Sequence, residues 1–228
     1  MLELRNLTVT LGDFSLNANL TVPQGARVAV IGPSGSGKST LLALIGGYLA
    51  PDQGQVIWQG QDLTQLRPGQ RPISTLFQDQ NLFPHLTVKQ NTGLGLRPDL
   101  RLTPDQHAAC QAALVQVGLA GMADRKPAQL SGGQQSRVAL ARVLLRRRPI
   151  LLLDEPFSAL GPALKSEMLV LLDQIAQDTT VLMVTHDPED ARRFAPLTVT
   201  ISEGHAAAPV PTGPLLDNPP PALRAYLG

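Results

Sequence analysis

The chain has 228 residues, 43% of them hydrophobic, which is enough to fill the core of one large domain or of a domain with a subdomain. With 19 basic and 18 acidic residues, the formal net charge is +1, so no electrostatic footprint for nucleic acid or an anionic membrane surface stands out. The single cysteine, Cys110, excludes an intramolecular disulfide and suits a reducing compartment. Glu3 and Arg5 interrupt the N-terminal stretch, so we expect no export signal. We also expect no membrane span, which needs roughly 18 to 20 consecutive apolar residues.

The first elements along the chain are predicted to be strands. Residues 14–22 alternate apolar and polar side chains, which is typical of a half-buried antiparallel strand, and residues 4–9 are its expected partner. Residues 26–31, 150–154 and 181–185 are continuous apolar runs, the pattern of strands buried on both faces of a parallel sheet. A turn and a helical pattern follow each run. The sequence therefore predicts an α/β fold.

A glycine-rich loop follows the first buried run. Its sequence, GPSGSGKS at 32–39, matches the pattern G-x-x-x-x-G-K-[ST] between a strand and a helix. Backbone N–H groups of such a loop close on phosphate oxygens, and the helix start adds its positive end. We predict that Lys38 reaches the β- and γ-phosphates and that Ser39 binds Mg²⁺, rather than an unliganded glycine-rich turn. The predicted nucleotide-binding residues here are Gly32, Pro33, Ser34, Gly35, Ser36, Gly37, Lys38, Ser39 and Thr40.

The pattern becomes helical between residues 79 and 130. Thr103 is a candidate N-cap, followed by Pro104 at the first helical position and Gln106 three residues after the cap. Gly118 is placed to end this helix. We expect a small helical insertion without a buried strand.

A second glycine-containing helix start lies in LSGGQ at 130–134. Ser131 and Gln134 have the spacing of a capping box, so the plainer interpretation is a well-started helix. A capping box alone does not explain why glycine occupies positions 132 and 133, because glycine inside a helix costs about 1 kcal/mol relative to alanine. Bare backbone at a helix start suits an anion, which favours a second phosphate contact. We expect it to face the nucleotide of a second copy in a head-to-tail dimer.

Two consecutive carboxylates close the buried run at 150–154. Asp154 and Glu155 lie at the edge of a parallel sheet where ligands bind. Consecutive strand residues face opposite ways, so we expect the two side chains to diverge. We assign Asp154 to Mg²⁺ and Glu155 to the base that orients the attacking water, against the alternative of a solvated turn.

Four motifs occur along the chain in the order GPSGSGKST, the glutamine of LFQD, LSGGQ and the histidine of VTHD. Together they resemble the nucleotide-binding subunits of ABC transporters, over nearly the whole chain to Gly204. The resemblance implies a P-loop NTPase (RecA-like) core sheet with an antiparallel β subdomain and a helical insertion. It divides the chain into a core at 1–78 and 131–204 and a helical subdomain at 79–130. We expect the Ala/Pro-rich residues 205–228 to form a loosely held tail.

The resemblance also implies residue roles. Gln78 corresponds to the family glutamine that senses Mg²⁺, water and the membrane subunits, and His186 to the histidine that contacts the γ-phosphate. The stretch from Asn81 to Val88, within a docking region near Gln78 to Leu96, is expected to receive permease subunits through Phe83 and its neighbours. ATP and Mg²⁺ are the implied cofactors. The implied setting is a homodimer on the cytoplasmic face of the inner membrane, acting indirectly with a solute-binding protein and without nucleic acid.

Residues 76–96 and 150–164 resemble the ATPases of thiamine importers, so thiamine or its phosphates are the expected solute. An importer of another small solute, such as iron, sulfate or a polyamine, and a non-transport regulatory ABC ATPase remain the alternatives. Two positions depart from the family. Leu11 stands where an aromatic ring stacks on adenine, with Phe14 nearby but expected in the core, and Gly161 stands where SALD would be usual.

Overall fold

The computed structural model describes residues 1–79, 81–221 and 223–224. The chain divides into two compact units. The first comprises Met1–Ile73, Pro149–Glu155 and Asp178–Gly228, and the second comprises Ser74–Arg148 and Pro156–Gln177. The second unit thus extends beyond the predicted helical segment at 79–130, because it also includes the helices that precede and follow residues 149–155 in the sequence.

The first unit is a mixed sheet with three α-helices, among the residues described. Its strands lie in the order β5-β4-β1-β2-β10-β9-β3-β8-β7, and β11 pairs with β9. The bounds are β1 Leu2–Leu11, β2 Phe14–Val22, β3 Arg27–Ile31, α1 Lys38–Gly46, β4 Gln53–Trp58, β5 Gln61–Asp62, the short 3₁₀ helix η1 Pro68–Gln70, β7 Ile150–Asp154, β8 Thr180–Val184, α6 Pro188–Phe194, β9 Leu197–Ser202, β10 His205–Ala206, β11 Val210–Pro211 and α7 Thr212–Asp217. Strand β6, Ile73–Leu76, leads into the second unit.

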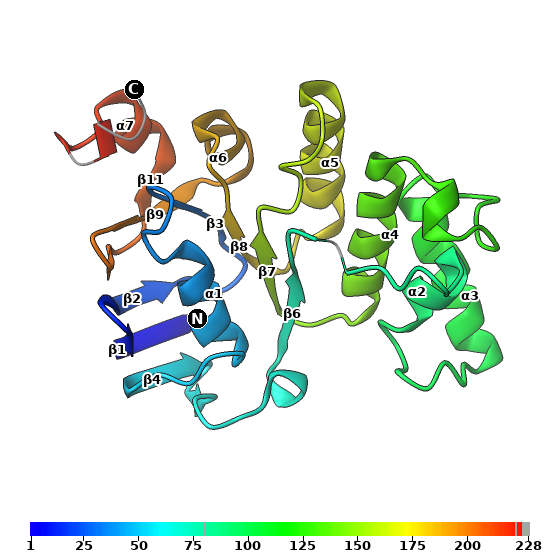
Figure 1. Cartoon of the computed structure of the whole chain (residues 1–228), viewed down its shortest axis with the longest axis horizontal. Helices are drawn as coiled ribbons and strands as arrows, with labels where there is room; N and C mark the ends of the chain where they lie inside the picture. The colour runs from blue at the N-terminus through cyan, green and yellow to red at the C-terminus, as the bar shows by residue number, and fades with distance from the viewer. Residues whose placement is uncertain (80, 222, 225–228) are drawn as a thin grey trace. The chain divides into compact units, whose positions relative to one another are not determined.

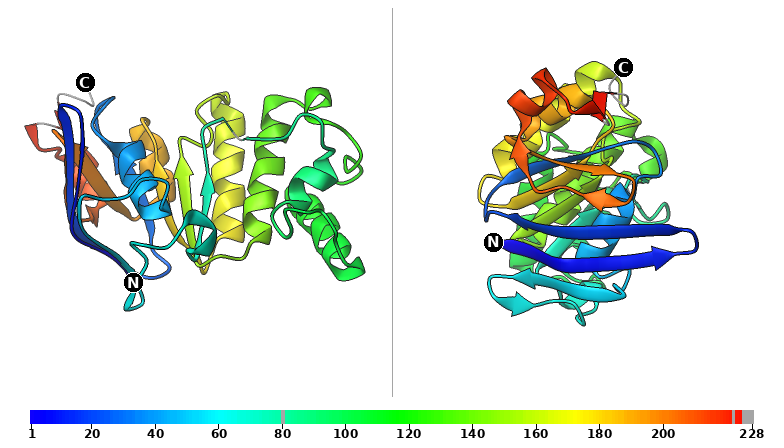
Figure 2. Two further views of the ribbon diagram at one scale, coloured as in Figure 1. Left: turned by 60° about the horizontal axis from the view of Figure 1, so that its bottom comes forward. Right: turned by 90° about the vertical axis from the view of Figure 1, so that its left-hand side faces the viewer.

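The antiparallel part of this sheet confirms the predicted alternation. β2 pairs with β1, and in β2 every second residue from Leu16 to Val22 is buried while the residues between are exposed. β1 also pairs with β4, so these three strands lie side by side (Figure 1), and β1 and β2 form one long hairpin (Figure 2, right). The alternation therefore reflects one face packed on the core and one exposed face.

The parallel part brings three strand ends to one edge. β3 pairs with β8 and β8 with β7, all parallel, and the residues of β8 are all buried. In this register Asp154 at the end of β7 lies opposite Val184 at the end of β8. The residues after β3, β7 and β8 therefore leave the sheet at its carboxyl edge, where ligands bind in parallel α/β sheets.

The chain after Gly204 is held, contrary to the prediction of a loose tail. His205–Ala206 forms β10 between β2 and β9, and Val210–Pro211 pairs with β9. Thr212 is buried, and its hydroxyl donates to the carbonyl of Ala195 at 2.6 Å. Composition misled here because backbone pairing with distant strands, rather than apolar periodicity, holds this segment; residues 222 and 225–228 lie outside the described part.

The second unit is helical after β6. It contains α2 Val88–Gly93, α3 Pro104–Gln116, the 3₁₀ helix η2 Pro127–Gln129, α4 Gly132–Leu145 and α5 Pro162–Ile175. The α3 start is confirmed: Thr103 and Gln106 form the capping box, and Gly118 has a φ of +73° just beyond the helix end. Apolar side chains of α2, α3 and α4 share one core. In the part of the chain that the structure describes, no helix is both long and apolar enough to cross a bilayer.

Candidate nucleotide-binding site

The loop between β3 and α1 depends on two of its glycines. Gly32 has a φ of +154°, and a Cβ there would overlap the backbone carbonyl of Ile201 on β9. Gly37 is the N-cap of α1 with a φ of +107°, and a Cβ there would lie 2.7 Å from the ring of Phe14. The loop is therefore pressed against the sheet at both ends, and backbone without side chains is what lets it close around a phosphate group.

Lys38 lies across its own loop. Its Nζ donates to the carbonyls of Gly32 at 2.8 Å and Pro33 at 2.9 Å, and the residue is 9% exposed. Burial lowers the pKa of Lys38, while the charges of Glu155 and Asp154 oppose that shift. The ammonium group is thus held inside the loop, close to the two carboxylates that were assigned to catalysis.

The oxygen atoms of Ser39 and Asp154 fit a magnesium ion. Ser39 Oγ donates to Asp154 Oδ1 at 3.1 Å, so a hydroxyl oxygen and a carboxylate oxygen lie next to each other at the carboxyl edge of the sheet. Mg²⁺ is usually held by one or two protein oxygens together with water and substrate phosphates. The Oγ of Ser36 is buried, with no hydrogen-bond partner in the described part of the chain, as expected of a donor that meets a ligand. Among the described residues, no cluster of three or more His, Cys, Asp or Glu could hold a metal by itself.

Replacing Asp154 with asparagine should stabilise the protein without nucleotide. Burial raises the pKa of Asp154, although the Ser39 hydrogen bond acts in the opposite direction. Because the pKa is higher in the folded state, the ionised carboxylate destabilises the fold above that pKa, and this cost fades as the pH falls through it. We expect Asp154→Asn to have a higher Tm at pH 8, a difference that shrinks toward pH 4, and to lose the stabilisation by Mg-ATP. Calorimetry across this pH range checks both effects; a lower Tm of the variant at pH 8 without nucleotide would contradict the argument.

Glu155 is not part of the strand, which corrects the expected geometry. β7 ends at Asp154, and Glu155 has a φ of +45°, in the left-handed region that costs a residue with a Cβ about 1–2 kcal/mol. Its backbone N–H donates to the carbonyl of Val184 at 3.2 Å. The left-handed turn, rather than strand alternation, therefore sets the direction of this side chain. Strained backbone of this kind clusters at functional sites.

His186 lies beside Glu155. Its Nδ1 is 3.3 Å from Glu155 Oε2, within hydrogen-bonding distance, and the tautomer that carries the proton on Nδ1 would donate to this carboxyl group. The local chain is fixed on both sides of the histidine. Thr185 N donates to the carbonyl of Val30, and the side chain of Asp187 accepts from Glu189 N as the N-cap of α6. The sheet edge thus brings Lys38, Ser39, Asp154, Glu155 and His186 together within the first unit.

The start of α4 confirms the predicted capping box. Ser131 Oγ accepts from Gln134 N at 3.3 Å, and Gln134 Oε1 accepts from Ser131 N at 3.0 Å. The two glycines differ, however. A Cβ on Gly133 would overlap the side chain of Leu164 on α5, whereas one on Gly132 would meet no atom within 4 Å. Packing therefore explains Gly133, whereas at the exposed Gly132 no packing contact requires glycine, so this is the residue whose bare backbone suits a phosphate.

This difference makes a matched pair of variants. Gly132→Ala should leave the fold intact or stabilise α4 by up to about 1 kcal/mol, while reducing ATP turnover, because the methyl group would stand where a phosphate approaches. Gly133→Ala should destabilise the fold by about 1–3 kcal/mol through overpacking against Leu164. Urea unfolding and ATPase assays on both variants separate the two effects. Unchanged turnover in Gly132→Ala would leave that glycine without a role at the nucleotide.

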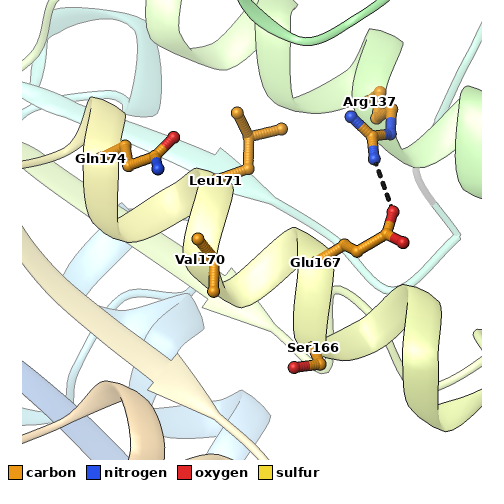
Figure 3. A pocket seen from close by; sticks show the side chains of 6 residues that line it. All are labelled: Arg137, Ser166, Glu167, Val170, Leu171 and Gln174. Carbon is orange, nitrogen blue, oxygen red and sulfur yellow. Dashed lines mark hydrogen bonds and ion pairs between the residues drawn. The ribbon is translucent and has the colours of Figure 1, made fainter.

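Arg137 braces α4 within the second unit. Its Nη1 donates to the carbonyl of Val117 at 2.9 Å, and its Nη2 lies 3.0 Å from Glu167 Oε2 on α5. Figure 3 shows this ion pair at one side of a surface pocket. The residues that line the pocket are Arg137, Ser166, Glu167, Val170, Leu171 and Gln174. The arginine after LSGGQ thus has a structural role in holding α4 to its neighbours.

Gln78 and the apolar residues after it belong to the second unit, whereas the phosphate loop belongs to the first. Gln78 is exposed in a turn after β6. Phe83 is 47% exposed, and its ring meets that of His85 edge-on at a centroid distance of 6.0 Å. The roles assigned to Gln78 and to this surface remain predictions.

The two departures from the family pattern have different structural settings. Leu11 is 45% exposed, whereas Phe14 packs on the core and against Gly37, as expected for a core residue. Gly161 is the N-cap of α5, with φ of −65° and ψ of 159°, and a Cβ there would meet no atom within 4 Å. A Cβ atom therefore fits at this N-cap without a clash.

Gly161→Asp should raise the ATPase rate at saturating ATP. The new carboxylate would cap α5, which stabilises the fold by a few tenths of a kcal/mol, and would restore the charge that the family pattern has here. Gly161→Asn is the matched control, because asparagine caps equally well without the charge. A rate that does not rise in the aspartate variant, or that rises equally in both, would refute a role for the charge.

Sequence reasoning missed Arg71, which anchors the helix that carries the loop. Its side chain is 1% exposed, and it donates from Nη1 to the carbonyls of Leu44 and Ile45 at the end of α1, at 2.8 and 2.7 Å. Nε and Nη2 donate to the carbonyls of Leu66 and Thr64. An arginine before a proline carries no sequence signal for this role, since all four acceptors are backbone atoms.

The loop, the carboxylate edge and the mixed sheet define a P-loop nucleotide-binding ATPase. The family model described as ABC transporter matches residues 16–158, and the chain belongs to this family. It is 62% identical to the thiamine import ATP-binding protein ThiQ of Cereibacter sphaeroides and 58% identical to that of Ruegeria sp., covering 100% of both chains in each case. ThiQ of Yersinia pestis is 52% identical, with 95% of this chain and 93% of the relative covered.

Solved structures show the same fold. Two dimeric structures of the ATP-binding cassette MJ0796, one of them in a post-hydrolysis state bound to ADP and Pi, match with a TM-score of 0.80 and 33% identity. The match covers 93% of this chain and 99% of the cassette. The predicted ABC ATPase fold is therefore confirmed.

Proposed function

We propose that this chain is the ATP-hydrolysing subunit of an ABC importer for thiamine or its phosphates. Full-length identity of 62% to a thiamine import ATP-binding protein supports thiamine as the solute. The single structural observation that carries the ATPase activity is the convergence of Lys38, Asp154 and Glu155 at one sheet edge. We place the chain on the cytoplasmic face of the membrane, bound to separate permease subunits.

In the proposed reaction, water attacks the γ-phosphate in line with the leaving oxygen. Glu155 orients the water and takes its proton, and His186 holds the Glu155 carboxylate through Nδ1 and contacts the γ-phosphate. Lys38 exchanges its two carbonyl acceptors for phosphate oxygens, which places its charge where negative charge develops. Ser39 and Asp154 would hold Mg²⁺, with Gln78 as a further ligand, and the ion would neutralise charge on the phosphates.

The second half of the site is proposed to come from another copy of the chain. We propose that Ser131, Gly132, Gly133 and Gln134, at the start of α4, form this phosphate contact. Ser131 and Gln134 pair with each other in the capping box, which leaves the N–H groups of Gly132 and Gly133 to meet a phosphate, and the first turn has no acidic residue to repel it. The dimeric state of the MJ0796 cassette supports a homodimer that forms on ATP.

Reconstitution tests the proposed function. The protein is purified together with the membrane subunits that bind it and placed in liposomes with ATP inside or outside. ATP-dependent uptake of radiolabelled thiamine, absent in a Lys38→Ala complex, is the expected result. Uptake of iron, sulfate or a polyamine instead would favour the alternative solutes. A chain that co-purifies with no membrane subunit and drives no uptake would favour a non-transport regulatory protein.

A further inference from the structure

Residues 81–87, here called the docking segment, are fixed at two points by side chains from two helices. The first point is Phe83. Asn91 on α2 is fully buried, and its Oδ1 accepts from Phe83 N at 2.8 Å while its Nδ2 donates to Phe83 O at 3.0 Å. The same Nδ2 lies within 3.2 Å of the carbonyls of Leu86 and Thr87. The side-chain amide of Asn91 therefore bonds to both the N–H and the carbonyl of Phe83, whose side chain is about half exposed.

The second point is Asn81. Arg142 on α4 donates from Nη1 to the Asn81 carbonyl at 2.7 Å, and Asn81 has a left-handed φ of +47°. Burial of the Arg142 side chain lowers its pKa. The guanidinium group is a charged donor, and hydrogen bonds from charged donors are shorter and stronger than those between neutral groups. Arg142 lies in the last turn of the helix that begins with the LSGGQ glycines.

The two helices are themselves in close contact. A Cβ on Gly95, just after α2, would overlap the backbone carbonyl of Arg142, so the chain there packs directly on the α4 backbone. Apolar residues of α2 and α4, including Val88 and Val138, share the core of the second unit. A displacement of α4 along or about its axis would therefore be passed to the docking segment through Arg142 and through α2.

We propose that Arg142 and Asn91 are positioning residues that tie the docking segment to α4, so that ATP binding at the start of α4 changes the surface offered to the permease. This inference rests on the proposed function, because it assumes that α4 meets ATP in the dimer. Neither residue touches nucleotide in this proposal, and neither was singled out by its sequence context.

Hydrogen–deuterium exchange on the full chain tests the proposal with Mg-ATP as the probe. A Glu155→Gln background traps the ATP-bound dimer, which light scattering detects independently. In this background, ATP should slow exchange of peptides spanning 81–87 by about threefold or more. Adding Arg142→Ala should preserve the dimer but remove the ATP-dependent slowing, and Arg142→Lys should restore it, because an ammonium group can still donate to one carbonyl.

The controls separate coupling from simple loosening. Arg146→Ala changes an exposed arginine at the C-cap of the same helix and should leave the slowing unchanged. If Arg142→Ala proves unstable, Asn91→Asp tests the other point, since it keeps the acceptor for Phe83 N but loses the donors. Faster exchange in the variants with an undiminished ATP effect would overturn the inference, whereas a Glu155→Gln protein that never dimerises would refute the proposed function instead.

Discussion

Glu155→Gln is expected to reduce ATP turnover by about 10²–10⁴-fold, the usual contribution of a positioned base, while ATP binding persists. Glutamine has nearly the same shape, so it can keep the left-handed turn and its neighbour His186, yet it cannot take a proton from water. ATP should then accumulate unhydrolysed, and the ATP-bound dimer should outlast that of the wild type. Steady-state ATPase assays, nucleotide binding and light scattering measure the three effects.

Glu203→Gln is the matched control for this experiment. Glu203 is also a glutamate with a left-handed backbone, at φ of +48°, but it lies in the exposed turn between β9 and β10. Its replacement should leave turnover within about twofold of wild type, as surface substitutions generally leave the fold intact. Wild-type turnover in Glu155→Gln would show that another group activates the water.

Arg71→Met is expected to destabilise the protein by about 3–5 kcal/mol, because each buried carbonyl left without a hydrogen-bond donor costs about 1–3 kcal/mol. Methionine fills similar volume but leaves the carbonyls of Leu44, Ile45 and Thr64 without this donor. A loss of this size lowers the Tm of a chain of this length by roughly 10 °C. Because α1 carries Lys38 and Ser39 at its start, Mg-ATP affinity should fall as well.

Two further variants sharpen the Arg71 prediction. Arg71→Lys keeps the charge but loses the planar fork that reaches four carbonyls in different directions, so it should recover only part of the stability. Arg67→Met removes an exposed arginine of the same loop and should change stability by less than about 0.5 kcal/mol. Urea unfolding checks all three; a loss below about 1 kcal/mol in Arg71→Met would show that water satisfies those carbonyls.

Much of the site was predictable from local sequence because its parts are local. The phosphate loop is nine consecutive residues between a buried strand and a helix, and the capping box of α4 spans four. Such patterns fix backbone conformation over a few residues, so their chemistry follows without the fold. The direction of Glu155 did not follow, since it depends on a backbone hydrogen bond to Val184 on a neighbouring strand.

The glycines show where local reasoning stops. Gly132 and Gly133 are adjacent and look equivalent in sequence, but the Leu164 side chain, 31 positions beyond Gly133, packs on one of them alone. The tail likewise looked unstructured by composition, yet it pairs with β2 and β9. Neither contact leaves a periodic signal in the sequence.

Spacing within short stretches of chain was enough to predict the strands at 14–22, 26–31, 150–154 and 181–185, the starts of α3 and α4, the phosphate loop and the family. The backbone carbonyls that Arg71, Asn91 and Arg142 reach became known only from the packed fold. Every residue has a backbone carbonyl group, so the sequence does not indicate which carbonyls will accept a hydrogen bond from these side chains. That choice is made when distant segments pack and each buried polar group must find a hydrogen bond.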